Sequence, residues 1–124
     1  MNLVDSCGWL EYFADGPNAG FFAKPIEKVE KLLVPTICIL EVFKRVYQQG
    51  GEDAAFQASA AMNQGIIVEM DAAIAMKAAK IGVEMKMPLA DSVILATARA
   101  RGATIWTQDE HFRNIAGVKF VEKK

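Results

Sequence analysis

The sequence predicts an α/β fold of three layers, in which a mainly parallel central sheet is flanked by helices. Strand-like and helix-like segments alternate along the whole chain, and parallel strands need such crossover helices between them. Three strand-like segments, KLLV, GIIV and ATIW, are apolar at nearly every position, which is typical of strands buried on both faces. With 124 residues and no repeat or linker, the chain is expected to form a single domain over residues 1–124.

Prolines, glycines and capping residues divide the first half of the chain. Ser6 is expected to cap the first helix, which turns one apolar side inward. Pro35 ends the second strand, and Thr36 caps the helix that follows. The pair Gly50-Gly51 ends that helix. The expected elements are strands at 2–5 and 31–35 and helical segments at 6–14, 16–31 (broken by two prolines), 36–49 and 52–64.

The second half of the chain continues the alternation of strands and helices, and its helix ends are more clearly marked. Asp71 is suited to cap a long helix, and Gly102 ends the next one. Short apolar runs on either side of these helices favour strands. The expected elements are strands at 65–70, 103–108 and 118–122 and helices at 71–86, 87–102 and 110–115.

Composition limits the classes of partner and compartment. The net charge is −1, so no overall basic field attracts nucleic acid, and the 52% hydrophobic content favours contact with a partner or a second copy. Cys7 and Cys38 are too few for a disulfide framework and lack zinc-site spacing, so both are expected to be free thiols. No signal-peptide-like start or membrane-length apolar run occurs. We expect a cytoplasmic protein with no membrane contact.

Four acidic residues occupy one kind of position, at or just past the end of a strand or inside the helix that follows it. They are Asp5, Glu41, Asp91 and Asp109. In a parallel sheet all strands end at one edge, where ligands bind. The sequence therefore predicts that these four carboxylates converge.

Each acid also has a simpler interpretation. Asp5 and Asp109 are suited to cap the helices that follow them, and Asp91 in a first turn favours the helix dipole. Glu41 is able to pair with basic residues three and four positions further on. As a set, however, clustered carboxylates repel one another, so four of them at one edge are costly unless a cation neutralises them.

The expected cation is Mg²⁺ or Mn²⁺, because every candidate ligand is a carboxylate oxygen. The only histidine, His111, is expected to lie on a helix surface rather than to bind metal. A carboxylate-bound ion with open positions polarises a phosphodiester oxygen and lowers the pKa of a bound water. These properties favour phosphodiester hydrolysis.

Other enzyme and binding classes with similar length fit less well. A receiver-like phosphoacceptor domain needs an acidic pair after the first strand and a lysine after the fifth, and a haloacid-dehalogenase-type phosphatase needs D-x-D where this chain has DSC. No glycine-rich nucleotide-binding loop is present.

Three segments, MNLVDSCGWLEYF, ICILEVFKR and PLADSVILATARARGATIWTQDEHF, together resemble the PIN-domain ribonucleases, and within them the VapC-type toxins of toxin–antitoxin pairs. The resemblance implies a compact PIN-like fold and cleavage of RNA with Mg²⁺ or Mn²⁺. It implies Asp5 and Asp91 as principal metal ligands, completed by Glu41 and by Asp109 or its neighbour Glu110. It also implies a homodimer and a cognate antitoxin that covers the active-site groove.

The remaining site assignments follow the same resemblance. Ser6 and Thr107 match polar residues that support the acids by hydrogen bonds. Phosphate contacts are expected from basic residues, each of which is otherwise an ordinary solvated side chain. They are Lys44, Arg45, Lys86, Arg99, Arg101 and Arg113. The pair Phe21-Phe22 is expected to line an exposed groove for the antitoxin. The alternative that sequence leaves open is a non-catalytic PIN-like module that only binds RNA or protein.

Overall fold

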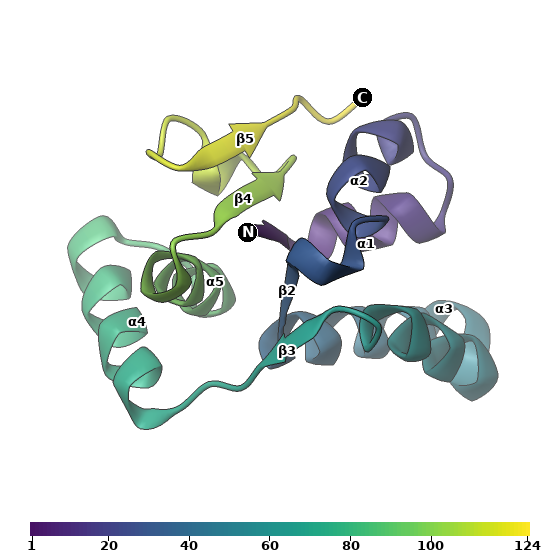
Figure 1. Ribbon diagram of the computed structural model, residues 1–124, viewed down its shortest axis with the longest axis horizontal. Coiled ribbons are helices and arrows are strands. Elements are labelled where there is room, and N and C mark those ends of the chain that lie inside the picture. Colours follow the sequence, from purple (N-terminus) through teal and green to yellow (C-terminus); the bar gives the residue numbers. More distant parts are fainter.

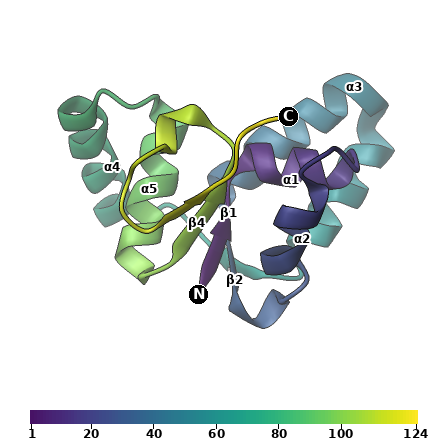
Figure 2. The same ribbon diagram turned by 90° about the horizontal axis from the view of Figure 1, so that it is seen from above.

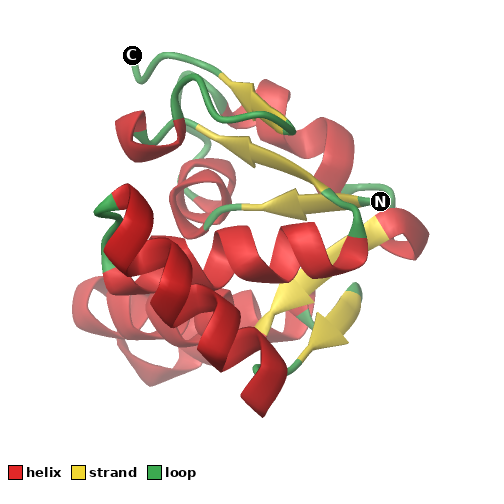
Figure 3. Cartoon of the chain, turned by 90° about the vertical axis from the view of Figure 1, so that its left-hand side faces the viewer, coloured by secondary structure: helices red, strands yellow, loops and turns green.

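A computed structural model describes all residues, 1–124, and shows a five-stranded sheet at the centre of the molecule. The strands are β1 (Asn2–Val4), β2 (Leu32–Pro35), β3 (Ile66–Val68), β4 (Thr104–Thr107) and β5 (Val118–Phe120). Their order is β3-β2-β1-β4-β5, and every neighbouring pair is parallel. The predicted α/β fold is confirmed, with a sheet that is parallel throughout. Figure 3 shows the strands layered between helices.

Helices cover both faces of this sheet. They are α1 (Ser6–Phe13), α2 (Ala19–Ile26), α3 (Thr36–Met62), α4 (Ala72–Met85) and α5 (Leu89–Arg101), with 3₁₀ turns η1 (Val29–Lys31) and η2 (Glu110–Phe112). In Figures 1 and 2, α1 and α2 lie on one side of the strands and α4 and α5 on the other. The long helix α3 packs against α1 and also contacts α5. None of the helices combines the length and apolar character needed to span a bilayer.

The sheet order determines which strand ends are neighbours. β1 pairs with β2 on one side and with β4 on the other, with Leu3 opposite Leu33 and Ile105. Because all strands run in one direction, the segments that leave β1, β2 and β4 emerge side by side at one edge. Asp5 follows β1 directly, and Asp109 follows β4 by one intervening residue.

Helix α5 is the most deeply buried helix. Every residue from 91 to 98 is buried, and the helix lies between β4 and α4. The aliphatic residues of this run join strand residues such as Leu3 and Ile105 in the main core. The core therefore fixes the helix that carries Asp91, and holds its first turn in place against the sheet.

The glycine pair predicted to end a helix instead produces a kink. The helix α3 spans 27 residues, but Gly51 inside it adopts φ 86° and ψ −178°, outside the helical region. A positive φ of this kind strains residues with a side chain, which explains why glycine occupies the position. The two expected helical segments, 36–49 and 52–64, therefore correspond to the two arms of α3.

Several sequence-based expectations about helix ends were wrong. Asp5, not Ser6, caps α1, and its side chain accepts a hydrogen bond from the Ser6 amide. Pro35 rather than Thr36 occupies the cap position of α3 and makes no capping hydrogen bond. The predicted helix at 110–115 is only the single turn η2. Asp71 does cap α4, as predicted, by accepting from the Ile74 amide at 2.9 Å.

The Phe21-Phe22 pair does not line an exposed groove. Phe22 is fully buried in the core, and Phe21 packs edge-on against it with ring centroids 5.0 Å apart. Phe21 also contacts the ring of Trp106 on β4. A run of two aromatic residues after a glycine was compatible with both locations, and tertiary packing of α2 on the sheet decides for the interior.

Close packing of α1 against α2 and β1 makes Gly8 a sensitive position. A β-carbon there would lie 2.5 Å from Phe22 Cδ1 and 2.7 Å from Val4 Cγ1, which forces the core apart. We predict that Gly8→Ala lowers the free energy of unfolding by about 1–3 kcal/mol, measured by urea denaturation. Gly20→Ala in α2, where no atom lies within 4 Å, is the control and should not destabilise the protein. Equal stability of the two variants would contradict this packing.

Candidate functional site

Asp5 is the most deeply buried acid at the carboxyl edge of the sheet, with a residue exposure of 3%. Its carboxylate accepts hydrogen bonds from the Ser6 amide at 2.7 Å, from Thr107 Oγ1 at 2.8 Å and from Cys7 Sγ at 3.2 Å. Burial raises the pKa of Asp5, and the bonds from Thr107 and Cys7 partly oppose that rise. Asp5 is thus both the cap of α1 and a member of the acidic cluster.

Glu41 approaches the same edge from α3. Ser6 Oγ donates a hydrogen bond to Glu41 Oε1 at 2.7 Å, so adjacent residues, Asp5 and Ser6, connect α1 to β4 and to α3. The simpler interpretation, a pairing of Glu41 with Lys44 or Arg45, is not observed, because no ion pair joins them. The Glu41 carboxylate therefore has no lysine or arginine partner.

Asp91 lies in the first turn of α5 and faces the other acids. Pro88 holds the cap position, so Asp91 is not the cap of its helix. Burial first, and then the negative charges of Asp109 and Asp5, raise the pKa of the Asp91 carboxyl to about 7, while His111 opposes the rise. Glu41 also contributes to this repulsion. The charges of all four predicted acids thus act on one another.

Asp109 joins the cluster from the loop after β4. Its amide donates to Thr107 Oγ1 at 2.9 Å, and its Oδ1 accepts from the His111 amide at 2.9 Å. The neighbouring Glu110 turns away, because it pairs with Arg113 at 3.2 Å and is largely exposed. Of this adjacent pair, only Asp109 faces Asp91.

His111 is a residue whose position the sequence did not reveal. Its side chain is 58% exposed, as expected for a surface residue, but its Nδ1 lies 2.9 Å from Asp91 Oδ2 and 3.0 Å from Asp109 Oδ1. The charge of Asp109, with a further contribution from Asp91, raises the pKa of His111. The only available signal was its spacing, since it is the chain's only histidine and stands two residues after an acid.

Cys7 is the second residue that sequence reasoning did not place at the site. The half-buried thiol lies 3.2 Å from Asp5 Oδ2 and 3.4 Å from Thr107 Oγ1. Burial and the Asp5 charge raise the pKa of the Cys7 thiol far above its usual value, so it stays protonated and donates to the carboxylate. Cys38 is buried in the core, and both thiols are free, as predicted.

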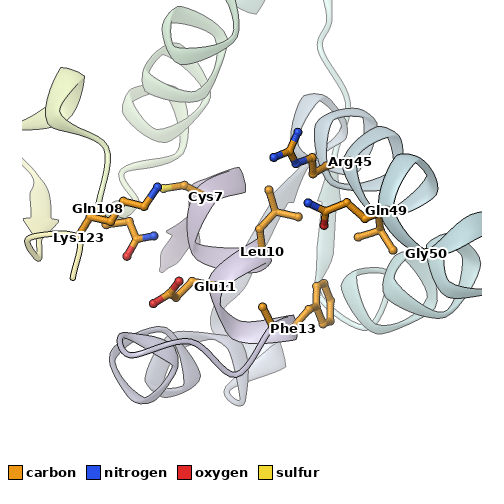
Figure 4. Close-up of a pocket in the computed structure, with 11 residues that line it drawn as sticks. Cys7, Leu10, Glu11, Phe13, Arg45, Gln49, Gly50, Gln108 and Lys123 are labelled. Atoms are coloured by element: carbon orange, nitrogen blue, oxygen red, sulfur yellow. The ribbon is translucent and has the colours of Figure 1, made fainter.

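Three adjoining hollows surround the acids on the molecular surface. The one drawn in Figure 4, between α1, α3 and the C-terminal tail, has a volume of about 490 Å³ and is flanked by Arg45 and Lys123. A second, of about 540 Å³, reaches Asp109 and shares Cys7, Gln108 and Lys123 with the first. A third, of about 370 Å³, contains Glu41 and shares Arg45 with the first. We call these three connected hollows the groove; Asp109 and Glu41 line it, whereas Asp5 and Asp91 do not.

The predicted basic residues differ in their distance from this groove. Arg45 lines two of its hollows, and Lys44 lines the third. Lys86 ends α4 in a left-handed conformation, in the turn before the helix that carries Asp91. Arg99 lies in the last turn of α5, about 12 Å along the helix axis from Asp91. Lys123, which sequence reasoning did not select, flanks the groove beside Gln108.

The donor set at this edge suits a divalent cation. The four acidic side chains supply only oxygen donors, and none of them contacts a lysine or arginine. Single ligand atoms of Asp91, Asp109 and His111 all lie within 4.8 Å of one another. A bound cation would relieve the repulsion that raises the pKa of Asp91. The carboxylate oxygens fit Mg²⁺ or Mn²⁺ better than they fit zinc.

Comparisons with known proteins agree with this fold. A family model described as the PIN domain matches residues 3–118. A comparison with curated proteins finds no match.

Several solved structures resemble the whole chain at low sequence identity. A toxin–antitoxin complex from Klebsiella pneumoniae has a TM-score of 0.82 at 22% identity and covers 96% of each chain. VapC20 from Mycobacterium tuberculosis, described as a toxin that cleaves the sarcin-ricin loop, has a TM-score of 0.78 at 17% identity, covering 95% of this chain and 97% of its own. A DNA-bound VapBC from Salmonella typhimurium has a TM-score of 0.75 at 13% identity, covering 98% of each chain.

The raised pKa of Asp91 predicts an unusual pH dependence of stability. Because folding raises this pKa from 3.8 to about 7, the folded state holds the proton more tightly, and stability is lost as pH rises from about 4 through 7. We predict that Asp91→Asn, without metal, raises the free energy of unfolding by about 1–2 kcal/mol at pH 8 and by much less at pH 4. This is less than the full linkage value because His111 shares the charge. Urea titrations in EDTA at both pH values measure the difference.

The matched control for this prediction is Asp53→Asn, which removes an exposed carboxylate of α3 away from the cluster. Its effect on the free energy of unfolding should be small and similar at both pH values. A gain in Asp91→Asn that is as large at pH 4 as at pH 8 would contradict the mutual repulsion of the acids.

Proposed function

The chain belongs to the PIN domain family, and from that premise we propose that it is a metal-dependent endoribonuclease that hydrolyses RNA phosphodiester bonds. The observation that supports the proposal is that four mutually repelling carboxylates, none of them paired with a lysine or arginine, lie at one edge of the sheet. Asp5 and Asp91 are the principal ligands for Mg²⁺ or Mn²⁺ in this proposal, and Glu41 and Asp109 complete the pocket. The whole chain acts as one domain.

The bound ion supplies polarisation of the phosphoryl oxygen and a water of lowered pKa. The protein orients its ligands through neutral donors. Thr107 and Cys7 hold the Asp5 carboxylate, and Ser6 holds Glu41, so these oxygens are held in place without a positively charged partner. Thr107 also accepts from the Asp109 amide, and therefore couples the positions of two acids. Ser6 and Thr107 are thus positioning residues.

RNA is proposed to lie along the groove beside this cluster. Arg45 and Lys44 line its hollows and are suited to hold phosphates on either side of the scissile bond. Lys86 and Arg99 lie further from the groove and are proposed as weaker, outer contacts. The open, shallow form of the groove suits a single strand or a loop rather than a duplex.

We propose that the protein is the toxin of a toxin–antitoxin pair and acts in the cytoplasm. The full-length structural similarity to a toxin–antitoxin complex and to a VapC toxin supports this assignment. A cognate antitoxin would silence the enzyme by occupying the groove, since that surface combines uncovered acids with apolar residues such as Leu10 and Phe13. The partner of a PIN-like module without catalysis would occupy the same groove.

A homodimer is proposed through the exposed side of α4 and the start of α5. Met76, Val83 and Leu89 are 69%, 81% and 84% exposed, although each is a large apolar side chain. Met76 and Val83 are seven positions apart and so lie on one side of α4. Exposed apolar residues of this kind indicate contact with another protein surface, and a second copy of the chain is the simplest partner.

Cleavage of a single-stranded RNA substrate tests the proposed activity. We expect the purified protein to cut the RNA in Mn²⁺ and to lose activity in EDTA. Asp5→Asn or Asp91→Asn should reduce the rate by about 10²-fold or more, because each change removes charge from the ion's ligands. Asp53→Asn is the control with the same chemical change outside the cluster, and should retain activity. Cleavage that persists in EDTA, or no cleavage with Mn²⁺ bound, would favour another mechanism or the non-catalytic alternative.

Graded effects on RNA binding test the role of the groove. In the cleavage-deficient Asp5→Asn background, Arg45→Gln should weaken affinity several-fold and reduce the slope of log K against log salt by about 0.7, the value for one contact to a single strand. Arg99→Gln at the far end of α5 should have the smaller effect on both quantities. Fluorescence anisotropy at several salt concentrations measures them. An equal or larger effect of Arg99→Gln would place RNA outside the groove.

A further inference from the structure

His111 occupies a position that the set of four carboxylates does not require. Its Nδ1 lies within 3.0 Å of two acids that come from different elements, Asp91 of α5 and Asp109 of the segment before η2. The ring is mostly exposed, so the core does not need it for packing. An exposed histidine without a role would point into water, whereas this one points into the acidic cluster.

The turn η2 holds His111 in that direction. The Asp109 carboxylate accepts from the His111 amide at 2.9 Å, and the Phe112 amide donates to the Asp109 carbonyl at 3.0 Å. The next side chain, Phe112, is completely buried in the core. On the outer side, Arg113 pairs with Glu110 and Glu122. The backbone at His111 is thus anchored from both sides, which keeps the imidazole within reach of Asp91 and Asp109.

The separations of His111 Nδ1 from the two carboxylate oxygens match those between neighbouring ligands of one ion. Octahedral ligands at about 2.0–2.1 Å from a metal are about 2.9–3.0 Å apart when they are adjacent. The two distances from His111 Nδ1 to the carboxylate oxygens are 2.9 and 3.0 Å. The imidazole nitrogen is therefore spaced as an adjacent ligand of an ion held by Asp91 and Asp109. The same distances are those of hydrogen bonds from a protonated imidazole, so a metal bound there would displace the Nδ1 proton.

We propose that His111 is a nitrogen ligand of the metal site and that it biases the site toward transition-metal ions over Mg²⁺. Carboxylates and water suit Mg²⁺, whereas imidazole adds affinity that grows along the transition series from Mn²⁺ to Co²⁺. This inference rests on the proposed function, because it concerns the ion that the four carboxylates hold. It assigns to this chain a mixed nitrogen and oxygen site in place of a purely acidic one.

Pulsed electron paramagnetic resonance of the Mn²⁺-loaded protein tests the ligand directly. Because the chain has one histidine, coupling to an imidazole ¹⁴N is assigned to His111 without ambiguity. The wild type should show this coupling, and His111→Asn, which keeps a short polar side chain at the same exposed position, should lose it. A Mn²⁺-loaded wild type without the coupling would overturn the proposal.

Calorimetric titrations with Mg²⁺, Mn²⁺ and Co²⁺ test the bias. His111→Asn should weaken Mg²⁺ binding by about twofold or less and Co²⁺ binding by about tenfold or more, with Mn²⁺ between them. Asp53→Asn is the control, since it removes a charge from an exposed residue of α3 outside the cluster, and it should change all three affinities by one similar small factor. The same factor for all three ions in His111→Asn would overturn the proposal. Bound Mn²⁺ and RNA cleavage without imidazole coupling would refute this inference alone, whereas a wild type that binds no Mn²⁺ would refute the proposed function as well.

Discussion

The position of β1 between two parallel neighbours is the constraint on which the site depends. It puts the residue after β1 beside the end of β4, so that Thr107 Oγ1 donates to the Asp5 carboxylate at 2.8 Å although 102 positions separate them in the chain. Cys7 also donates a hydrogen bond to Asp5, and Ser6 donates one to Glu41 of α3. A change in strand order would disperse these groups, whatever their individual chemistry.

The side-chain donors that hold Asp5 and Glu41 are neutral, and this has an electrostatic consequence. A lysine or arginine at the same positions would orient the carboxylates and also cancel their charge. Hydroxyl, thiol and amide donors orient Asp5 and Glu41 without adding a positive charge. Burial, and for Asp91 also the charges of Asp109 and Asp5, raise the pKa values of Asp5 and Asp91. The metal-free protein thereby loses some stability at neutral pH, as is common where function requires an unfavourable local arrangement. The buried run of α5 and the parallel sheet supply the rigidity that tolerates this repulsion.

The sequence predicted the elements that depend on local pattern. Alternating segments and fully apolar strands indicated the parallel sheet, and the glycine pair marked the break within α3. The positions of Asp5, Glu41, Asp91 and Asp109 relative to the strand ends indicated that they meet, because parallel topology brings strand ends to one edge. In the structure the charges of the other three acids act on Asp91, but only Asp91 and Asp109, with His111, have ligand atoms within 4.8 Å of one another. No sequence feature gave the hydrogen-bond partners of these acids.

The sequence did not predict features for which two arrangements fitted the local pattern equally well. Asp5 and Ser6 are both good helix caps, and only the register of β1 against β4 decides that Asp5 has that role. Phe22 is apolar and adjoins a glycine in either location, so its burial under α1 needed tertiary information. His111 is exposed, as its polarity suggested, and its direction is set by a turn that is anchored by Phe112 in the core.

Anomalous diffraction from crystals soaked in saturating Mn²⁺ tests most directly whether these side chains hold an ion. We expect an anomalous peak among the carboxylate oxygens of Asp5, Asp91 and Asp109, at bonding distance from at least two of them. Ordered Mn²⁺ elsewhere on the protein, with no peak among these acids, would contradict the central claim that the sheet edge gathers them for a metal.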